Sequence, residues 1–305
     1  TADSGGSKPT TAEPQQHDPR GPPEIVPSVA NRSLSYDEID RGERIGAGGN
    51  ADVYTARLPD GQQVALKEPR MEGTVDIKAV ERFVQEAETW DKLDDHDHVV
   101  SVVDYGDKPA PWLVLEYMDA GDMSAVLATE PSFEARVWMS VSICRAVRHA
   151  HRRGVAHLDL KPANVLFQSA GESWPVPKVA DWGLAKMLLD HSKSVEGFSP
   201  NYAAPEQFAT EEYGSPDDIT DIYQTGAVCY ELFTGEPPFK GSNAGVMRSV
   251  LNDQPTPPSS VAEVPAALDD VLFRALEKEK ADRYESIIEL RDALADLSEH
   301  RTNSE

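Results

Sequence analysis

The chain has 305 residues, 39% of them hydrophobic, which is enough for one large domain or two lobes around a packed core. Its 53 acidic residues outnumber 29 basic ones and give a net charge of -24, which argues against nucleic acid and anionic lipid as general partners. No run of about 18 apolar residues occurs, so the sequence predicts no membrane segment. The acidity fits either a solvated surface or adaptation to a high-salt cytoplasm that screens self-repulsion.

Both ends of the chain have the composition of unstructured polypeptide. Residues 1–34 are rich in Pro, Gly, Ser and Gln, which predicts a disordered linker, and residues 299–305 predict a polar tail. The sequence shows no signal peptide, so we expect a cytoplasmic protein. Because the chain starts at Thr1 rather than Met, we keep open an upstream sensor or anchor domain in a longer chain.

The sequence between these ends predicts a strand-rich lobe followed by a helical one. From about residue 40 to 117 short alternating runs dominate, and Asp60-Gly61 between two of them is typical of a hairpin turn. One helix interrupts these runs near residues 78–93. From about 122 to 298 helical periodicity takes over, as in VWMSVSICRAVRHAHRRG. The predicted fold class is therefore α+β.

The first candidate site is a glycine-rich stretch, IGAGGNADVY. Gly46, Gly48 and Gly49 crowd a short loop, and the absence of side chains lets backbone N–H groups approach a phosphate. A dinucleotide-binding fold would need a helix directly after such a loop. Here ADVYTARLPDG follows, which alternates as a strand and turns into a hairpin, so the sequence argues against that fold.

A lysine stands in the middle of an apolar strand, VALKEP. One interpretation of Lys67 is a surface lysine whose stem follows the strand. The other is that its ammonium meets phosphates and a carboxylate, because an unpaired charge there would be costly to bury. The helix FVQEAETWDKL offers Glu86 and Glu88 as partners. Phe83 and Trp90 mark the packed side of this helix, and its periodicity favours Glu86.

The most informative stretch is GVAHLDLKPANVLF, together with VADWGLAK. Asp159 and Asn164 stand on a loop after the basic end of a helix, and Asp181 ends a short apolar strand. Two carboxylates and an amide suit oxygen ligation of Mg²⁺ and base chemistry on a hydroxyl. Any one of these Asp residues could equally be a turn or a helix cap. Their occurrence together and in this order favours the chemical interpretation.

The chain is thereby identified as similar to the eukaryotic-type (Hanks-like) serine/threonine protein kinases, over residues 40–298. The resemblance implies the two-lobed kinase fold, with an N-lobe at about 40–117 and a C-lobe at about 122–298. It also implies that ATP and Mg²⁺ bind and that phosphate passes to Ser and Thr of protein substrates. Lys161, placed after Asp159, resembles Ser/Thr rather than Tyr kinases, and the acidic flank indicates the prokaryotic or archaeal branch.

The resemblance also implies roles for individual residues. It makes Asp221 and the pair of Arg283 with Glu206 structural anchors. The implied catalytic and metal-binding residues are Asp159 as base, Lys161 on the γ-phosphate, Lys67 with its partner Glu86, and Asn164 and Asp181 on magnesium. The implied nucleotide-binding residues are Ile45, Gly46, Ala47, Gly48, Gly49, Asn50, Ala51, Val53, Ala65, Lys67, Glu116 and Met118.

Three positions depart from the pattern of the family. Ala51 replaces the third loop glycine, Trp182 replaces Phe of Asp-Phe-Gly, and Leu158 replaces Arg of His-Arg-Asp. We expect Trp182 to pack as Phe would. The resemblance places the end of the activation segment at Ala204-Pro205-Glu206. Leu158 removes a cation that a phosphate on this segment would neutralise, although Ser192, Ser194 and Ser199 still offer hydroxyls there. The departures leave every residue expected to touch ATP, metal or the acceptor hydroxyl in place.

Two other functions stay open at this level. A pseudokinase would act as a nucleotide-binding scaffold or signalling module, and it usually lacks Lys67, Asp159 or Asp181, all of which are present. A small-molecule kinase of similar fold is disfavoured by the Ala-Pro-Glu segment and by the helix that carries Asp221.

Overall fold

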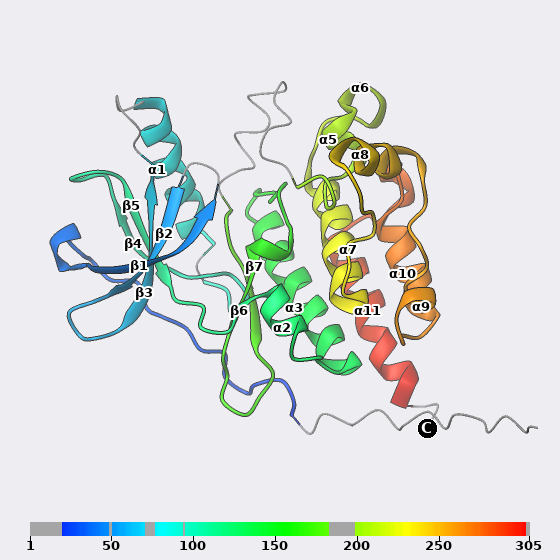
Figure 1. Ribbon diagram of the computed structural model, residues 1–305, viewed down its shortest axis with the longest axis horizontal. Helices are drawn as coiled ribbons and strands as arrows, with labels where there is room; N and C mark the ends of the chain where they lie inside the picture. Colours follow the sequence, from blue (N-terminus) through cyan, green and yellow to red (C-terminus); the bar gives the residue numbers. More distant parts are fainter. Residues whose placement is uncertain (1–19, 49–50, 71–76, 94, 183–198, 303–305) are drawn as a thin grey trace, which may run out of the picture.

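The described part of the chain forms two lobes that lie side by side, a smaller one of strands and a larger one of helices (Figure 1). The predicted α+β, two-lobed class is confirmed. The computed structural model describes residues 20–48, 51–70, 77–93, 95–182 and 199–302.

An antiparallel sheet of five strands, in the order β1-β2-β3-β5-β4, forms the smaller lobe. Helix α1 contacts β4, and a 3-10 turn at Tyr36–Glu38 precedes the sheet. The predicted hairpin between β2 and β3 turns at Gly61, whose φ of 85° costs glycine little. The elements of this lobe are β1 (Asp40–Gly48), β2 (Ala51–Arg57), β3 (Gln63–Pro69), α1 (Ile77–Asp91), β4 (Val102–Gly106) and β5 (Trp112–Glu116).

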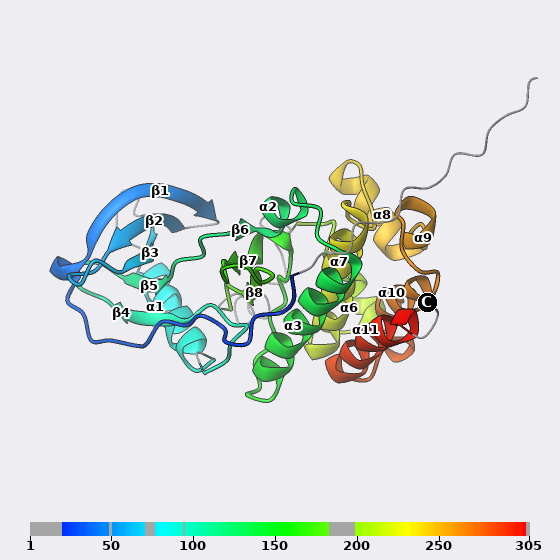
Figure 2. The ribbon, with the colours of Figure 1, turned by 90° about the horizontal axis from the view of Figure 1, so that it is seen from below.

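The larger lobe consists of helices and a small sheet in the order β6-β7-β8, which lies next to the first lobe (Figure 2). Its strands are β6 (Gly121–Asp122), β7 (Val165–Gln168) and β8 (Val176–Val179). Its helices are α2 (Met123–Leu127), α3 (Phe133–His151), α5 (Pro205–Phe208), α6 (Thr210–Tyr213), α7 (Asp218–Thr234), α8 (Asn243–Asn252), α9 (Pro258–Val261), α10 (Ala267–Ala275) and α11 (Ile287–Thr302), with 3-10 turns at Pro162–Asn164 and Lys280–Asp282. Residues 299–302, expected in the polar tail, thus continue α11.

Helix α7 is the centre of the larger lobe. It begins at the N-cap Asp217, ends at Gly235 in the left-handed conformation, and is buried along nearly its whole length against α3, α10 and α11. A helix buried on all sides must satisfy its polar side chains within the protein. Its buried polar residues, Asp221 and Gln224 among them, therefore need partners, and both find them on the loop described below.

Residues 20–34 differ from the sequence expectation of a disordered linker. This segment runs along both lobes, as the dark blue trace of Figure 2 shows. The Pro27 carbonyl accepts from Lys178 Nζ at 2.8 Å in the larger lobe, and Arg32 N donates to Val103 O at 2.9 Å in β4. Its composition gave no sign of these contacts, because backbone groups make them. Residues 1–19 of the predicted linker lie outside the described residues.

None of the helices within the described ranges combines the length and the apolar character that crossing a bilayer requires.

Candidate active site

Lys67 lies in β3 and contacts two carboxylates. Its Nζ is 2.7 Å from Glu86 Oε1 on α1 and 2.6 Å from Asp181 Oδ1, just after β8. Burial by itself would lower the pKa of a lysine, but the charges of Asp181 and Glu86 outweigh it and raise the pKa of Lys67. Lys67 therefore stays cationic and joins the two lobes.

The carboxylate against Lys67 is that of Glu86, as the helix periodicity predicts. Phe83 and Trp90 are buried on the packed side of α1, and Glu88 is exposed. Trp90 Nε1 donates to Val100 O at 2.7 Å, which fixes the helix against the chain that follows it. Burial of this face holds Glu86 within reach of the strand.

Asp159 lies on the loop between α3 and β7, with 8% of its side chain exposed. Lys161 Nζ contacts Asp159 Oδ2 at 2.7 Å, and Asn164 Nδ2 donates to the backbone oxygen of Asp159 at 2.9 Å. Burial raises the pKa of Asp159, and the ammonium of Lys161 only partly offsets that rise. A carboxylate with a raised pKa that stands beside a positioned cation is suited to accept a proton.

A buried carboxylate on α7 holds the start of this loop. Asp221 Oδ2 accepts from His157 N at 2.7 Å and contacts His151 Nε2 at 2.7 Å, and Asp221 Oδ1 accepts from Leu158 N at 2.8 Å. Leu158 has a φ of 58°, a left-handed conformation that such a residue adopts only where its surroundings hold it. The Leu158 side chain is buried in the larger lobe.

Asp181 follows β8 and points its carboxylate at Lys67. Burial would raise the pKa of Asp181, but the Lys67 charge outweighs it and lowers that pKa. Trp182 is buried next to it, donates from Nε1 to Val179 O at 3.0 Å, and lies with its ring centroid 4.8 Å from that of His157. The aromatic body of Trp182 packs as expected of the Phe that it replaces.

The β1–β2 hairpin carries the predicted phosphate loop. Gly46 pairs with Val53 across the hairpin, and Ile45 is 50% exposed. A Cβ added to Gly46 would meet Val53 at 3.6 Å, an ordinary contact, so the packing of the chain does not itself require glycine there. Close approach of a ligand remains a reason for it. Of the predicted set, Gly49 and Asn50 lie outside the described residues, as does the side chain of Ala47.

Four predicted residues share one face of the sheet. Val53 is the register partner of Lys67, and Ala51 and Ala65 lie two residues from them along their strands. Side chains alternate between faces along a strand, so these small and apolar groups line the face that carries the Lys67 ammonium. That face is the one turned toward α1 and Asp181.

Comparison with known proteins assigns this arrangement to a family. The model of the protein kinase domain family matches residues 39–293. The chain belongs to the protein kinase family. It is 36% identical to the serine/threonine-protein kinase Pkn1 of Myxococcus xanthus, over 84% of this chain and 38% of that protein. It is 33% identical to the serine/threonine-protein kinase PknB of Mycobacterium tuberculosis, over 84% of this chain and 42% of that protein.

This kinase is also 33% identical to a probable serine/threonine-protein kinase, CE0033, of Corynebacterium efficiens, over 86% of this chain and 41% of that protein. These relatives are bacterial, in line with the prokaryotic branch that the sequence indicates. The chain spans about two fifths of the length of the curated relatives it matches.

The donor set of this kinase fits a magnesium ion. Asp181 supplies a carboxylate, and because Asn164 turns its Nδ2 to the Asp159 backbone, its amide oxygen is the end left for a cation. Among the described residues there is no cluster of three or more His, Cys, Asp or Glu that would hold a metal without help. Mg²⁺ bound with ATP needs only one or two protein oxygens, because phosphates and water supply the rest.

The last residue of β5 and the segment that follows it carry the two predicted adenine contacts. Glu116 is buried and its carboxylate is committed to Lys178 of β8, with Nζ–O distances of 2.8 and 2.9 Å. Met118 follows, half-buried, where the chain crosses to the larger lobe. Sequence reasoning missed this ion pair. The signal was present, because Lys178 in VPKVAD stands in an apolar strand just as Lys67 does.

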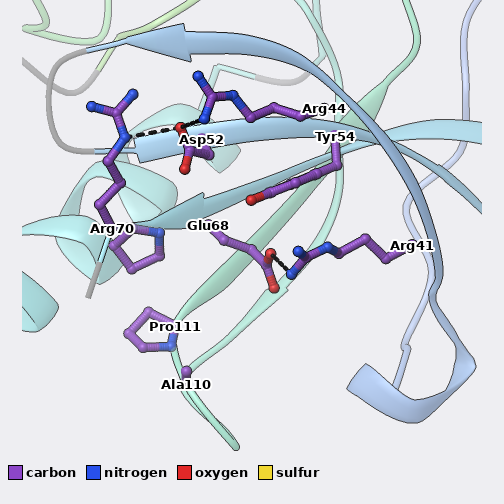
Figure 3. Close-up of a pocket in the computed structure, with 9 residues that line it drawn as sticks. Arg41, Arg44, Asp52, Tyr54, Glu68, Arg70, Ala110 and Pro111 are labelled. Atoms are coloured by element: carbon purple, nitrogen blue, oxygen red, sulfur yellow. Dashed lines mark hydrogen bonds and ion pairs between the residues drawn. The ribbon is translucent and has the colours of Figure 1, made fainter. Parts of the chain in front are cut away.

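A pocket of about 640 Å³ lies on the opposite face of the sheet (Figure 3). Glu68 lines it, and as the neighbour of Lys67 on β3 it points away from the catalytic side. Its charges are paired within the pocket, Arg41 with Glu68 at 2.9 Å and Arg70 with Asp52 at 2.9 Å. None of the residues that line this pocket belongs to the predicted site.

Proposed function

We propose that this kinase domain transfers the γ-phosphate of ATP to serine and threonine hydroxyls of protein substrates. The observation that carries the proposal is that Lys67 contacts Glu86 and Asp181, and that Asp181 follows a residue bonded to the loop of Asp159 and Lys161. Hydrogen bonds join the two parts: Ala180 N, next to Asp181, donates to Asn164 O at 2.9 Å, and His157 Nε2 contacts Ala180 O at 2.9 Å. Phosphate-binding cations and a proton acceptor therefore belong to one site.

The reaction follows from these positions. The acceptor oxygen bonds to the γ-phosphorus, its proton passes to the Asp159 carboxylate, and the bond from that phosphorus to the bridging oxygen breaks, which releases ADP. Lys161 compensates charge on the γ-phosphate, and Lys67, held by Glu86, orients the phosphates nearer the nucleoside. Asn164 and Asp181 would hold Mg²⁺, which neutralises phosphate charge when bound. The glycine hairpin would cover the phosphates, and the backbone at Glu116 and Met118 would take the adenine.

The acceptor class follows from similarity. The relatives named above are serine/threonine kinases by name, and Lys161 supports the same class here. The test is transfer of labelled phosphate from ATP to three peptides that differ only in Ser, Thr or Tyr. We expect label on the Ser and Thr peptides and little on the Tyr peptide. A preference for Tyr would overturn the acceptor class. Nucleotide binding without any transfer would favour a scaffold, for which the comparisons give no support.

Regulation is proposed to act away from the activation segment. Leu158 offers no cation for a phosphate there, so activity is expected to need no such phosphate. Control then falls to the position of α1, which carries Glu86, or to a sensor or anchor region of a longer protein. The greater length of the relatives supports such a region. A reaction that consumes ATP on protein substrates suits a cytoplasmic domain.

A further inference from the structure

We propose that Gln224 and Gln207 are positioning residues that hold the catalytic loop around Asp159 through uncharged amide contacts. The proposal rests on the kinase function above, and it identifies what secures this loop in a chain that carries Leu158 at the Arg position. Gln224 lies on the central helix α7 and is 2% exposed, and Gln207 lies on α5, directly after Glu206.

Gln224 contacts both peptide groups that flank Asp159. Its Oε1 accepts from Leu160 N at 3.0 Å, and its Nε2 donates to Leu158 O at 3.2 Å. These two peptide groups set the backbone dihedral angles of Asp159, which determine where its carboxylate stands. One side chain on a buried helix therefore hydrogen-bonds to the peptide groups on both sides of Asp159.

Gln207 joins the end of the activation segment to the same point. Its Nε2 donates to Leu158 O at 2.8 Å, its Oε1 accepts from Ala204 N at 2.9 Å, and the same Oε1 accepts from Gln224 Nε2 at 2.9 Å. The Leu158 carbonyl thus receives two donors, one from each glutamine. Segments that are distant in sequence, the catalytic loop, α5 and α7, meet through two neutral side chains.

The orientation of both amides follows from their partners. Backbone N–H groups only donate and carbonyls only accept, so Leu160 N and Ala204 N each require the oxygen end of a glutamine, and Leu158 O requires the nitrogen ends. With both amides turned this way the contact between the two glutamines is also a proper hydrogen bond. The network is self-consistent, and the reversed orientation of either amide would place like groups against each other.

The backbone of Leu158 shows why such a hold is needed. At a φ of 58° a leucine is disfavoured and persists only where its peptide groups are fixed. Asp221 holds its N–H, and the two glutamines hold its C=O. The contacts on the carbonyl side carry no charge, so they hold the loop in every phosphorylation state of the activation segment.

The experiment measures the rate per active site in the whole chain. Gln224→Leu, Gln207→Leu and the double variant are compared with wild type, with kcat expressed per nucleotide-binding site so that unfolded protein does not count. We expect Gln224→Leu to lower kcat about 10-fold or more while KM for ATP changes less than about twofold, because misplacement of a catalytic group affects the chemical step. The double variant should lose at most about threefold more, since both amides serve one carbonyl.

Thr225→Val is the matched control. Thr225 is the next residue on α7, is equally buried, and spends its hydroxyl on the Asp221 backbone oxygen of its own helix. The Thr225→Val variant should be less stable than wild type, because it lacks a buried hydrogen-bonding hydroxyl. Its kcat per site should be unchanged. A kcat per site within twofold of wild type in both single glutamine variants would overturn the proposal. So would an equal fall in Thr225→Val. If Gln224→Leu fails to fold, the kcat per site of Gln207→Leu, a substitution at a less buried position, tests the proposal instead.

A second readout separates this proposal from the kinase function. Hydrogen exchange at the Leu160 amide, which donates to Gln224 Oε1, should quicken in Gln224→Leu by about 10-fold or more beyond any change that lower stability causes in Thr225→Val. Unchanged exchange in Gln224→Leu would contradict the network whether or not the protein transfers phosphate. Absence of transfer in the wild-type chain, with exchange behaving as described, would count against the proposed function only.

Discussion

Arg283 and Glu206 form a fully buried, two-pronged ion pair, in which Nη1–Oε1 and Nη2–Oε2 are both 2.8 Å apart. The resemblance implied this pair from sequence, and the structure confirms it. Burial raises the pKa of Glu206, but the hydrogen bonds and charge of Arg283 outweigh that effect and lower it. The end of the activation segment is thereby fixed to the loop before α11.

Glu206→Gln should destabilise the larger lobe by about 3 kcal/mol, because it leaves the Arg283 guanidinium buried without a counter-charge. Urea unfolding at neutral pH measures the change. The exposed pair of Lys240 with Glu236 serves as the control, and Lys240→Met should leave the midpoint within error. Since the Glu206 pKa is lowered on folding, the pair stabilises fully above the ordinary Glu pKa and less as pH falls through the lowered value. An unchanged midpoint in Glu206→Gln would show that the pair contributes nothing net.

The pH dependence of transfer should reflect the environment of Asp159. A base works only when ionised, so kcat/KM falls as pH drops through its pKa, and burial places that loss at a higher pH than for an exposed aspartate. Removing the nearby cation in Lys161→Ala should raise the pKa of Asp159 further and move the acid limb to still higher pH, besides lowering the rate. A limb that stays in place or moves to lower pH would remove Asp159 from the role of base.

How far the sequence predicted the fold and site depends on the kind of signal. The β2–β3 hairpin followed from Asp60-Gly61 between alternating runs, and the choice of Glu86 followed from helix periodicity. Both are local patterns with a fixed period, which the structure preserves because burial enforces it. The pair of Arg283 with Glu206 has no local pattern, and only the family resemblance supplied it.

Other features lacked a signal that a sequence could carry. Gln207 and Gln224 reach the Leu158 carbonyl from 49 and 66 residues away, and a glutamine has neither charge nor periodicity to mark its partner. Residues 20–34 have the composition of a linker, yet their backbone groups find partners on both lobes. Such contacts depend on how the two lobes are arranged in space, so the sequence alone does not predict them.

Activity should not depend on phosphate in the activation segment. Ser192 and Ser194 lie outside the described residues, but position 158, where the family pattern has Arg, holds a leucine and offers a phosphate no cation. Phosphatase-treated protein and the Ser192→Ala/Ser194→Ala double variant should keep most of their initial rate. Initial rates before and after treatment measure this, with removal of phosphate verified by mass. A collapse on treatment that autophosphorylation at either serine restores would contradict the expectation.

Salt should stabilise the chain if its acidity reflects a high-salt cytoplasm. With a net charge of -24, screening by KCl weakens self-repulsion in the compact state, so the Tm should rise from low to molar salt. Thermal melting across that range is compared with glycerol at matched osmolality, which does not screen charge. A flat or falling Tm in KCl would remove the high-salt interpretation and leave the kinase assignment untouched.

Transfer of labelled phosphate by Asp159→Asn, set against wild type at saturating ATP and Mg²⁺, tests the central claim most directly. The Asn keeps the size and hydrogen bonds of the side chain but cannot accept the proton. We predict a rate lower by about 10²-fold or more with an unchanged Kd for nucleotide. Equal rates in the two proteins, with equal nucleotide binding, would contradict the assignment of Asp159 as the base of a phosphotransfer enzyme.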